Sequence, residues 1–196
     1  MNFDFSADPF LQLDGFVKQA AEKGLKDPNA MALATATEEG KPSVRIVLYK
    51  GLIRGGLSFY TNYEGRKGRE LAGNPFASVC FFWPTLDVQI RVEGEVAPLT
   101  RDESEAYFRT RARLSQVGAW ASHQSETISG TAELQAHVDE IEKRFQGREI
   151  PCPPHWGGFH LIPSSFEFWF NRSGRLHERF CFLREGSGWK RLMKSP

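Results

Sequence analysis

Segment 168–179 combines the residue types best suited to binding a polar ligand. It begins with an aromatic strand end, Phe168–Phe170, and continues into a turn that carries three arginines and a histidine. Arg175 and His177 are separated there by Leu176, and alternate residues of a strand-like segment face the same side. Both side chains donate hydrogen bonds. We therefore predict that Arg175 and His177 contact one ligand while the leucine anchors the turn.

Tyr107, Arg111 and Ser115 recur at four-residue spacing. On one continuous helix they would place a phenol, a guanidinium and a hydroxyl on the same face, where together they could bind a phosphate. A break in the helix near 111–113 would change this geometry, although a loop can still bring the three groups together. The alternative is an exposed polar helix face, which the spacing alone does not exclude.

Arg66 and Lys67 lie in the first turn of a short helix expected over 65–74. The helix dipole disfavours cations at that end by roughly 0.3 to 1 kcal/mol each. A phosphate bound by the free amides of the turn and by both side chains would reverse the sign of this cost. A solvated charged turn is the alternative, because Arg69 and Glu70 follow directly.

Arg45 and Lys50 bracket the apolar run Ile46-Val47-Leu48. They are five positions apart and therefore lie on opposite faces of an ideal strand, which suggests contacts to two different ligands. Surface charges without a ligand are the alternative, since Lys and Arg are mostly exposed in proteins.

The elements that would position these residues indicate a mixed antiparallel barrel with flanking helices. Asp8 and Pro9 provide an N-cap and a first-turn proline for an opening helix that ends at Gly24, and Thr100 with Glu103 forms a capping box for a helix reaching about Thr110. A further helix is expected over 131–145. Alternating or β-rich runs predict strands over 31–37, 43–49, 57–61, 76–83, 88–96, 157–162, 165–170, 179–184 and 188–192.

Composition narrows the classes of function. The formal charge of +1, from 25 basic and 24 acidic residues, gives no general field for nucleic acid or anionic lipid. Cys80, Cys152 and Cys181 show no paired spacing, so we expect reduced thiols and no metal site. The chain shows no signal peptide and no apolar run long enough to cross a membrane. We expect a cytoplasmic protein with one domain.

Five blocks in order resemble the pyridoxamine (pyridoxine) 5′-phosphate oxidase family of flavoenzymes, and the resemblance extends from about Asp8 to Leu192. It implies the FMN-binding split-barrel fold, mainly β with flanking helices, as a single domain over 1–196 with an N-terminal helical segment over 1–25. It also implies a homodimer with FMN between the two subunits. The blocks are 45–50, 60–62, 65–67, 115–120 and 168–179.

The resemblance also implies a set of FMN ligands. Gln89 lies on the polar face of an alternating strand, and Arg179 would stabilise the negative charge of the reduced flavin. Trp169 has core packing as a competing role, whereas Arg179 needs a partner if it points inward. The implied FMN ligands are Arg45, Ile46, Val47, Leu48, Lys50, Tyr60, Thr61, Arg66, Lys67, Gln89, Gln124, Ser125, Trp169 and Arg179.

The implied substrate is pyridoxamine 5′-phosphate or pyridoxine 5′-phosphate. FMN would oxidise its 4′ carbon to give pyridoxal 5′-phosphate, and O2 would reoxidise the flavin with release of H2O2. Arg175 and His177 match the family's catalytic positions beside the pyridine ring. The implied substrate ligands are Lys50, Tyr107, Arg111, Ser115, Arg175, Leu176 and His177.

Departures from the family pattern leave two rival functions open. Phe170 and Asn171 replace a glutamine and a glycine that often follow the tryptophan, and we expect that an N-terminal arm which can cover the substrate is missing. The rivals are a related flavin oxidase acting on another ring system, such as a phenazine precursor, and a non-catalytic module that binds FMN or pyridoxal phosphate.

Overall fold

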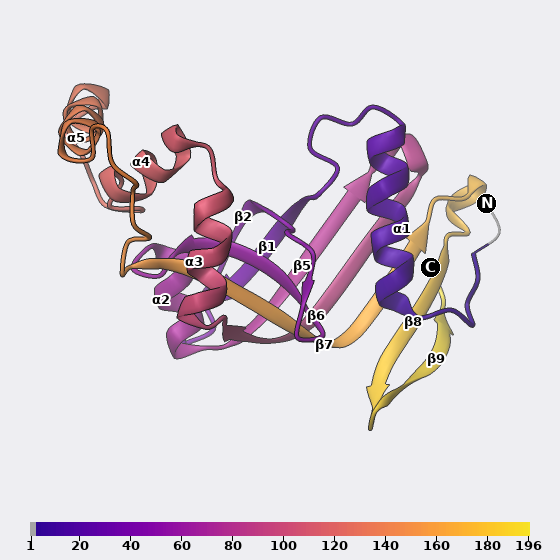
Figure 1. Ribbon diagram of the computed structural model, residues 1–196. Coiled ribbons are helices and arrows are strands. Elements are labelled where there is room, and N and C mark those ends of the chain that lie inside the picture. Colours follow the sequence, from indigo (N-terminus) through magenta and orange to yellow (C-terminus); the bar gives the residue numbers. More distant parts are fainter. Residues whose placement is uncertain (1–2) are drawn as a thin grey trace.

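The computed structural model describes residues 3–196 and shows a mostly antiparallel sheet with helices at its ends (Figure 1). Met1 and Asn2, the start of the predicted N-terminal segment 1–25, lie outside the described residues. The helices are α1 (Pro9–Glu22), α2 (Arg66–Gly73), α3 (Arg101–Thr110), α4 (Arg113–Ala121) and α5 (Thr131–Arg144). The strands are β1 (Ala30–Ala36), β2 (Pro42–Leu48), β3 (Leu52–Ile53), β4 (Gly56–Asn62), β5 (Phe76–Trp83), β6 (Val88–Pro98), β7 (Trp156–Phe170), β8 (Glu178–Glu185) and β9 (Gly188–Lys194).

The sheet has the split-barrel arrangement expected from the sequence. Its main path runs β2-β1-β5-β6-β7-β4-β3, and β8 and β9 extend from β7. Strand β7 joins the two parts, because its first half pairs with β4 and its second half pairs with β8. The helices α3, α4 and α5 lie at one end of the molecule, whereas α1 and the β8–β9 hairpin lie at the other (Figure 1).

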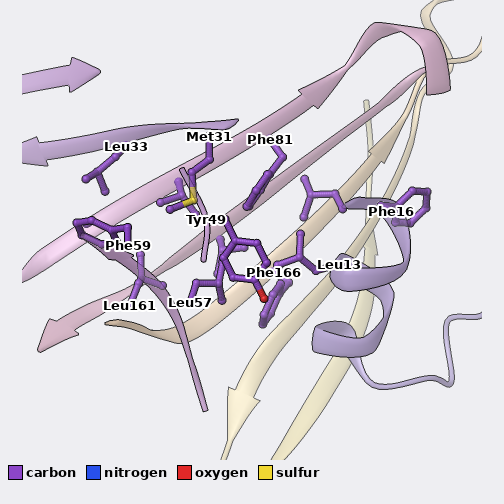
Figure 2. Close-up of a cluster of buried hydrophobic side chains, with 14 of the residues drawn as sticks. Leu13, Phe16, Met31, Leu33, Tyr49, Leu57, Phe59, Phe81, Leu161 and Phe166 are labelled. Atoms are coloured by element: carbon purple, nitrogen blue, oxygen red, sulfur yellow. The ribbon is translucent and has the colours of Figure 1, made fainter. Parts of the chain in front are cut away.

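The hydrophobic core lies between α1 and the inner face of the sheet (Figure 2). Strand β6 alternates buried and half-exposed residues along most of its length, as the apolar periodicity predicts. Asp8 caps α1 by accepting hydrogen bonds from the Phe10 and Leu11 amides. The Tyr49 hydroxyl then fastens α1 to the sheet with a 2.7 Å hydrogen bond to Asp14 Oδ1. A second apolar cluster, which includes Phe108 and Trp156, lies beneath α3, α4 and α5.

One predicted element boundary is wrong, and another is confirmed. The strands expected over 157–162 and 165–170 form one continuous strand, β7, whose register against β6 shifts between Glu93 and Gly94. The helix that starts after Thr100 does contain the expected capping box. It ends at Thr110, as predicted, and Arg111, whose ψ of 145° is extended, separates it from helix α4, which begins at Arg113.

Gly94→Ala is expected to destabilise the protein by about 3 kcal/mol. A Cβ atom at Gly94 would lie 2.0 Å from the Ile162 carbonyl oxygen on β7, so the two backbones would have to move apart. Urea unfolding would measure the loss. Gly188→Ala is the matched control, because its nearest neighbouring atom is 3.8 Å away. Equal stability of the two variants would contradict this account of the close contact at the register shift.

Candidate functional site

A cleft of about 510 Å³ gathers most of the predicted phosphate-binding residues. Strand β2 forms one wall, β4 and α2 form the floor, and the α3–α4 junction forms the other wall. Every lining residue except Ala112 and Trp156 belongs to the predicted set. The lining residues are Arg45, Ile46, Val47, Leu48, Lys50, Tyr60, Thr61, Lys67, Tyr107, Arg111, Ala112, Ser115, Gln124 and Trp156.

Three stacked aromatic rings form one side of this cleft. The Tyr60 and Tyr107 ring centroids are 3.9 Å apart with an interplanar angle of 19°, and the Tyr60 and Trp156 centroids are 5.5 Å apart. The Lys50 ammonium lies 5.8 Å from the Tyr107 ring centroid. Burial, with the neighbouring Tyr107 phenol, raises the pKa of Tyr60 to about 12. Tyr60 is therefore a neutral hydrogen-bonding group at physiological pH.

Arg111 carries an unpaired donor in this stack. Its guanidinium lies 4.6 Å from the Trp156 ring centroid, and its Nη1 atom is buried without a hydrogen-bond partner among the described residues. Burial lowers the pKa of Arg111, which still leaves an arginine charged in practice. A buried charged donor without an acceptor is costly. An anionic ligand at this position would supply the missing acceptor.

The break between α3 and α4 determines how Tyr107, Arg111 and Ser115 are arranged. The single-helix alternative for Tyr107, Arg111 and Ser115 is wrong, because Arg111 has left the helical conformation. The three residues nevertheless line the same cleft, since the turn at Ala112 brings Ser115 back toward Arg111. The loop alternative stated for this segment is therefore the one that the structure adopts.

Arg45 and Lys50 also line one cleft rather than two. Burial alternates along β2 and continues to Lys50, so that Arg45 is half-buried and Lys50 is exposed. Gly51, with φ of 92°, turns the chain immediately afterwards. Both faces of this segment border the cleft, since Ile46, Val47 and Leu48 line it as well, and the expected contacts to two different ligands stay a prediction.

Lys67 lies in the floor of the cleft and is already paired with neutral acceptors. Its Nζ donates to Thr61 Oγ1 at 3.0 Å and to Gln124 Oε1. Burial lowers the pKa of Lys67, and the charge of Arg45 lowers it further. Ser125, next to Gln124, accepts a 3.1 Å hydrogen bond from the Arg66 amide at the start of α2. The side chains of Arg66 and Ser125 do not line the cleft itself.

Glu70 is a buried carboxylate that the sequence analysis did not assign to the site. One oxygen accepts hydrogen bonds from Thr35, Ser43 and Arg45, and the other accepts a 2.8 Å hydrogen bond from Arg66 Nε. Burial alone would raise the pKa of Glu70, but the hydrogen bonds outweigh it and lower the value to about 2. The i, i+4 spacing of Arg66 and Glu70 was the available sequence signal.

Glu70→Gln is expected to remove an acid-sensitive part of the stability. The ordinary carboxyl pKa of 4.5 is lowered to about 2 in the folded protein, so the ionised Glu70 stabilises the fold fully above about pH 4.5. That contribution is lost as the pH falls from 4.5 through 2. Urea unfolding at several pH values should show the stability difference between parent and variant shrinking over this range. A constant difference would contradict the assignment.

A second set of predicted residues lies on the other end of the sheet. Gln89 and Arg179 are the register partners of Trp169 on its two sides. The His177 ring centroid lies 4.5 Å from the Trp169 ring centroid. Arg179 Nη2 donates to Glu167 Oε2 at 2.6 Å, which supplies the partner that an inward arginine requires. Glu167 was not anticipated from the sequence.

The turn that carries Arg175 is not strand-like, contrary to the prediction. Residues 173–175 form a short 3-10 turn, and Arg175 itself has a φ of 60°, in the left-handed region. Leu176 is 74% exposed and does not anchor the turn within its own chain. Arg175 is exposed, whereas His177 is half-buried.

The two sets cannot meet within one chain. Trp156 lines the cleft and Trp169 lies in the second set, near the opposite end of the 15-residue strand β7. At about 3.3 Å per residue, such a strand extends over tens of ångströms. A single chain therefore presents two half-sites: the cleft, and the Gln89–Trp169–His177–Arg179 cluster, called here the tryptophan cluster.

A larger hollow of about 1080 Å³ lies between α3, α4 and α5 and is also rich in arginines. Two of its four arginines bind carbonyls of the protein itself, and a third, Arg111, also lines the cleft. Arg113 donates to the carbonyls of Phe145 and Arg148 near the end of α5, and Arg148 donates to the Arg144 carbonyl. These contacts satisfy helix-end carbonyls. We therefore place the functional site in the smaller cleft.

The fold and these contacts define an antiparallel split-barrel protein with a cationic cleft beside one edge of the sheet. The chain belongs to the pyridoxamine 5′-phosphate oxidase family. Residues 17–145 match the family's model described as pyridoxamine 5′-phosphate oxidase, and residues 156–196 match the one described as the pyridoxine 5′-phosphate oxidase C-terminal dimerisation region.

Similar proteins agree with this membership. The pyridoxine/pyridoxamine 5′-phosphate oxidase of Bdellovibrio bacteriovorus is 49% identical over 99% of this chain and 100% of its own length. That of Rubrobacter xylanophilus is 49% identical over 96% of this chain and 87% of its own. The structure of PhzG from Burkholderia lata, in complex with tetrahydrophenazine-1-carboxylic acid, superposes with a TM-score of 0.92 at 32% identity, covering 100% of this chain and 98% of that one.

Proposed function

We propose that this protein is an FMN-dependent oxidase that converts pyridoxamine 5′-phosphate or pyridoxine 5′-phosphate into pyridoxal 5′-phosphate, with O2 as the electron acceptor and release of H2O2. With the amine substrate, water hydrolyses the imine that forms, and ammonia is released as well. The observation that carries the proposal is the convergence of the predicted flavin and substrate-phosphate residues on one cleft. Relatives named for this activity across nearly the whole chain support it.

The substrate phosphate is assigned to Lys50, Tyr107, Arg111 and Ser115. Two cations and two hydroxyls suit a phosphate dianion, because charge-assisted hydrogen bonds are stronger than neutral ones. The unpaired Nη1 of Arg111 supports this assignment, since it is a buried donor that awaits an acceptor. Holding the phosphate fixes the position of the pyridine ring and contributes to catalysis through orientation.

The FMN is assigned to the part of the cleft between β2, β4 and α2. The cations Arg45 and Lys67 in the cleft suit its phosphate, as does Arg66 beside them, which shares the Glu70 carboxylate with Arg45. The polar groups of Thr61 and Gln124 beside Lys67 suit its hydroxyls and ring edge. When bound, FMN would supply the two-electron redox chemistry that oxidises the substrate's 4′ carbon with O2 as the final acceptor. The chain's own residues bind and orient the two ligands, and no side-chain nucleophile is needed.

The tryptophan cluster is assigned to the same reaction through the partner subunit. Two-fold symmetry would allow each subunit to complete the other's cleft, and the C-terminal segment that carries Trp169, Arg175 and Arg179 lies in the matched dimerisation region. Outward-facing apolar side chains on β2, which include Val44 at 69% and Ile46 at 67% exposure, support burial against a second copy. Arg175 and His177 would then orient the pyridine ring from the side away from the flavin.

The test is an assay of the purified protein with FMN, pyridoxamine 5′-phosphate and oxygen. We expect pyridoxal 5′-phosphate and peroxide in equal amounts, and bleaching of the flavin colour when the amine is added without oxygen. Bound FMN that no phosphorylated vitamer reduces would reject the proposal in favour of a non-catalytic flavin-binding module.

A phenazine-type oxidase is the second candidate, because PhzG shares the fold so closely. A substrate without a phosphate would have no use for the Lys50, Tyr107, Arg111 and Ser115 group. Flavin reduction by a dihydrophenazine carboxylic acid that outpaces reduction by pyridoxamine 5′-phosphate would favour this candidate.

None of the helices in residues 3–196 has the length and apolar character required to cross a bilayer.

A further inference from the structure

We propose that Glu70 is a positioning residue that holds Arg45 and Arg66 in place for the phosphate of the flavin nucleotide. The inference rests on the proposed function, because it takes FMN as the ligand of this part of the cleft. It goes further in assigning a role to an acidic residue inside a site for an anion, where electrostatics alone would disfavour one.

Glu70 joins the two arginines at different points of their guanidinium groups. It binds Arg66 through Nε at 2.8 Å, and the Nη groups of Arg66 have no partner among residues 3–196. It binds Arg45 through Nη2 at 3.3 Å, while Arg45 Nη1 donates to Leu33 and Thr35. Arg45 Nε has no partner among the same residues. Each arginine therefore keeps at least one donor free while its orientation is fixed.

The surroundings of Glu70 show that its carboxylate is built into the fold. The residue is only 5% exposed, and Thr35 on β1 and Ser43 on β2 both donate to it. Burying a charge is costly unless it is paired and hydrogen-bonded. Here both carboxylate oxygens accept hydrogen bonds from β1, β2 or α2, so Glu70 links the helix that carries Arg66 and Lys67 to the strand that carries Arg45.

Glu70 also accounts for a cation at an unfavourable helix position. Arg66 is the first residue of α2, where the helix dipole disfavours positive charge. The carboxylate one turn later offsets this repulsion and draws the Arg66 side chain back along the helix. Without Glu70, the half-exposed Arg66 side chain would lose its anchor, and the two guanidinium groups that now share one carboxylate would repel each other.

Two roles for Glu70 predict opposite changes in phosphate affinity. If Glu70 were only a counter-ion, its removal would leave the cleft more positive and FMN would bind more tightly. If it positions the arginines, its removal lets them move, and FMN binds less tightly despite the additional positive charge. Riboflavin lacks the phosphate, so the ratio of the riboflavin and FMN dissociation constants isolates the effect on phosphate recognition.

The experiment measures both dissociation constants by quenching of flavin fluorescence for the parent protein, Glu70→Gln, Glu70→Asp and Glu38→Gln. Glu70→Gln removes the charge and keeps the size, whereas Glu70→Asp keeps the charge and withdraws it by one methylene. Glu38→Gln is the matched control. Glu38 and Arg66 line one shallow groove, formed by residues 37–39 and helix α2, but Glu38 forms no ion pair within residues 3–196. Riboflavin binding shows in each case that the variant is folded.

We expect both Glu70 variants to lower the riboflavin-to-FMN ratio about tenfold, which corresponds to roughly 1.4 kcal/mol, and the control to leave it unchanged. A ratio that stays constant or rises in Glu70→Gln would overturn the positioning role, as would a parental ratio in Glu70→Asp. A parent protein that binds FMN no better than riboflavin would instead refute the proposed phosphate site, and the parental measurement alone would reveal it.

Discussion

Arg111→Ala is expected to lower kcat/KM for pyridoxamine 5′-phosphate about 100-fold, mainly through a higher KM. The buried guanidinium has an unpaired Nη1 that we assign to the substrate phosphate. Hydrogen bonds between charged groups contribute roughly 1.5 to 3 kcal/mol, and each 1.36 kcal/mol corresponds to a factor of about ten in rate. Steady-state kinetics with the FMN-loaded protein would measure the change.

Two controls separate loss of the phosphate contact from general damage. Arg109→Ala removes an exposed arginine of α3, two residues before Arg111, that does not line the cleft. It should leave kcat/KM within about twofold because isolated surface changes are usually small. Unphosphorylated pyridoxamine should be oxidised equally slowly by the parent and by Arg111→Ala. A similar fold-loss for both substrates would show that Arg111 supports the cleft through its stacking on Trp156 instead.

The sequence predicts the parts of this protein that depend on local pattern. The alternation of β6, the capping box at Thr100 and Glu103, and the first helix all follow from spacing and residue type, and the structure contains them. The family resemblance adds the split barrel. The residues assigned to the cleft are grouped because β2, β4 and the α3–α4 junction carry them as compact blocks of sequence.

The features that escape prediction depend on partners distant in sequence. Glu167 on β7 binds Arg179 on the neighbouring strand β8, and no local sequence pattern around either residue predicts this pair. The long strand β7 continues past Pro163 because Gly94 on the neighbouring strand absorbs the register shift. The left-handed conformation of Arg175 depends on the turn around it, so the alternation argument for Arg175 and His177 fails.

The division of the predicted residues into two half-sites leads to a complementation experiment. Arg111→Ala damages the cleft and Arg175→Ala damages the region of the tryptophan cluster. With substrate well below KM, we expect each homodimer to lose at least about 100-fold in activity, while Arg175→Ala retains its flavin. In a heterodimer of the two variants, one composite site would carry both substitutions and the other would carry neither. Refolding equal amounts together should therefore restore about one quarter of the parental activity, because random pairing makes half of the dimers mixed and each has one intact site.

A matched pair of variants from the same half-site tests the geometry of this recovery. Lys50→Ala and Arg111→Ala both alter the cleft, so a heterodimer of these two would carry one substitution in each composite site and should recover no activity. Recovery in the first mixture and not in the second requires that each site takes its cleft from one subunit and Arg175 from the other. If neither mixture recovers although size-exclusion and tag-exchange measurements show mixed dimers, Arg175 acts within its own chain, and the composite site is refuted.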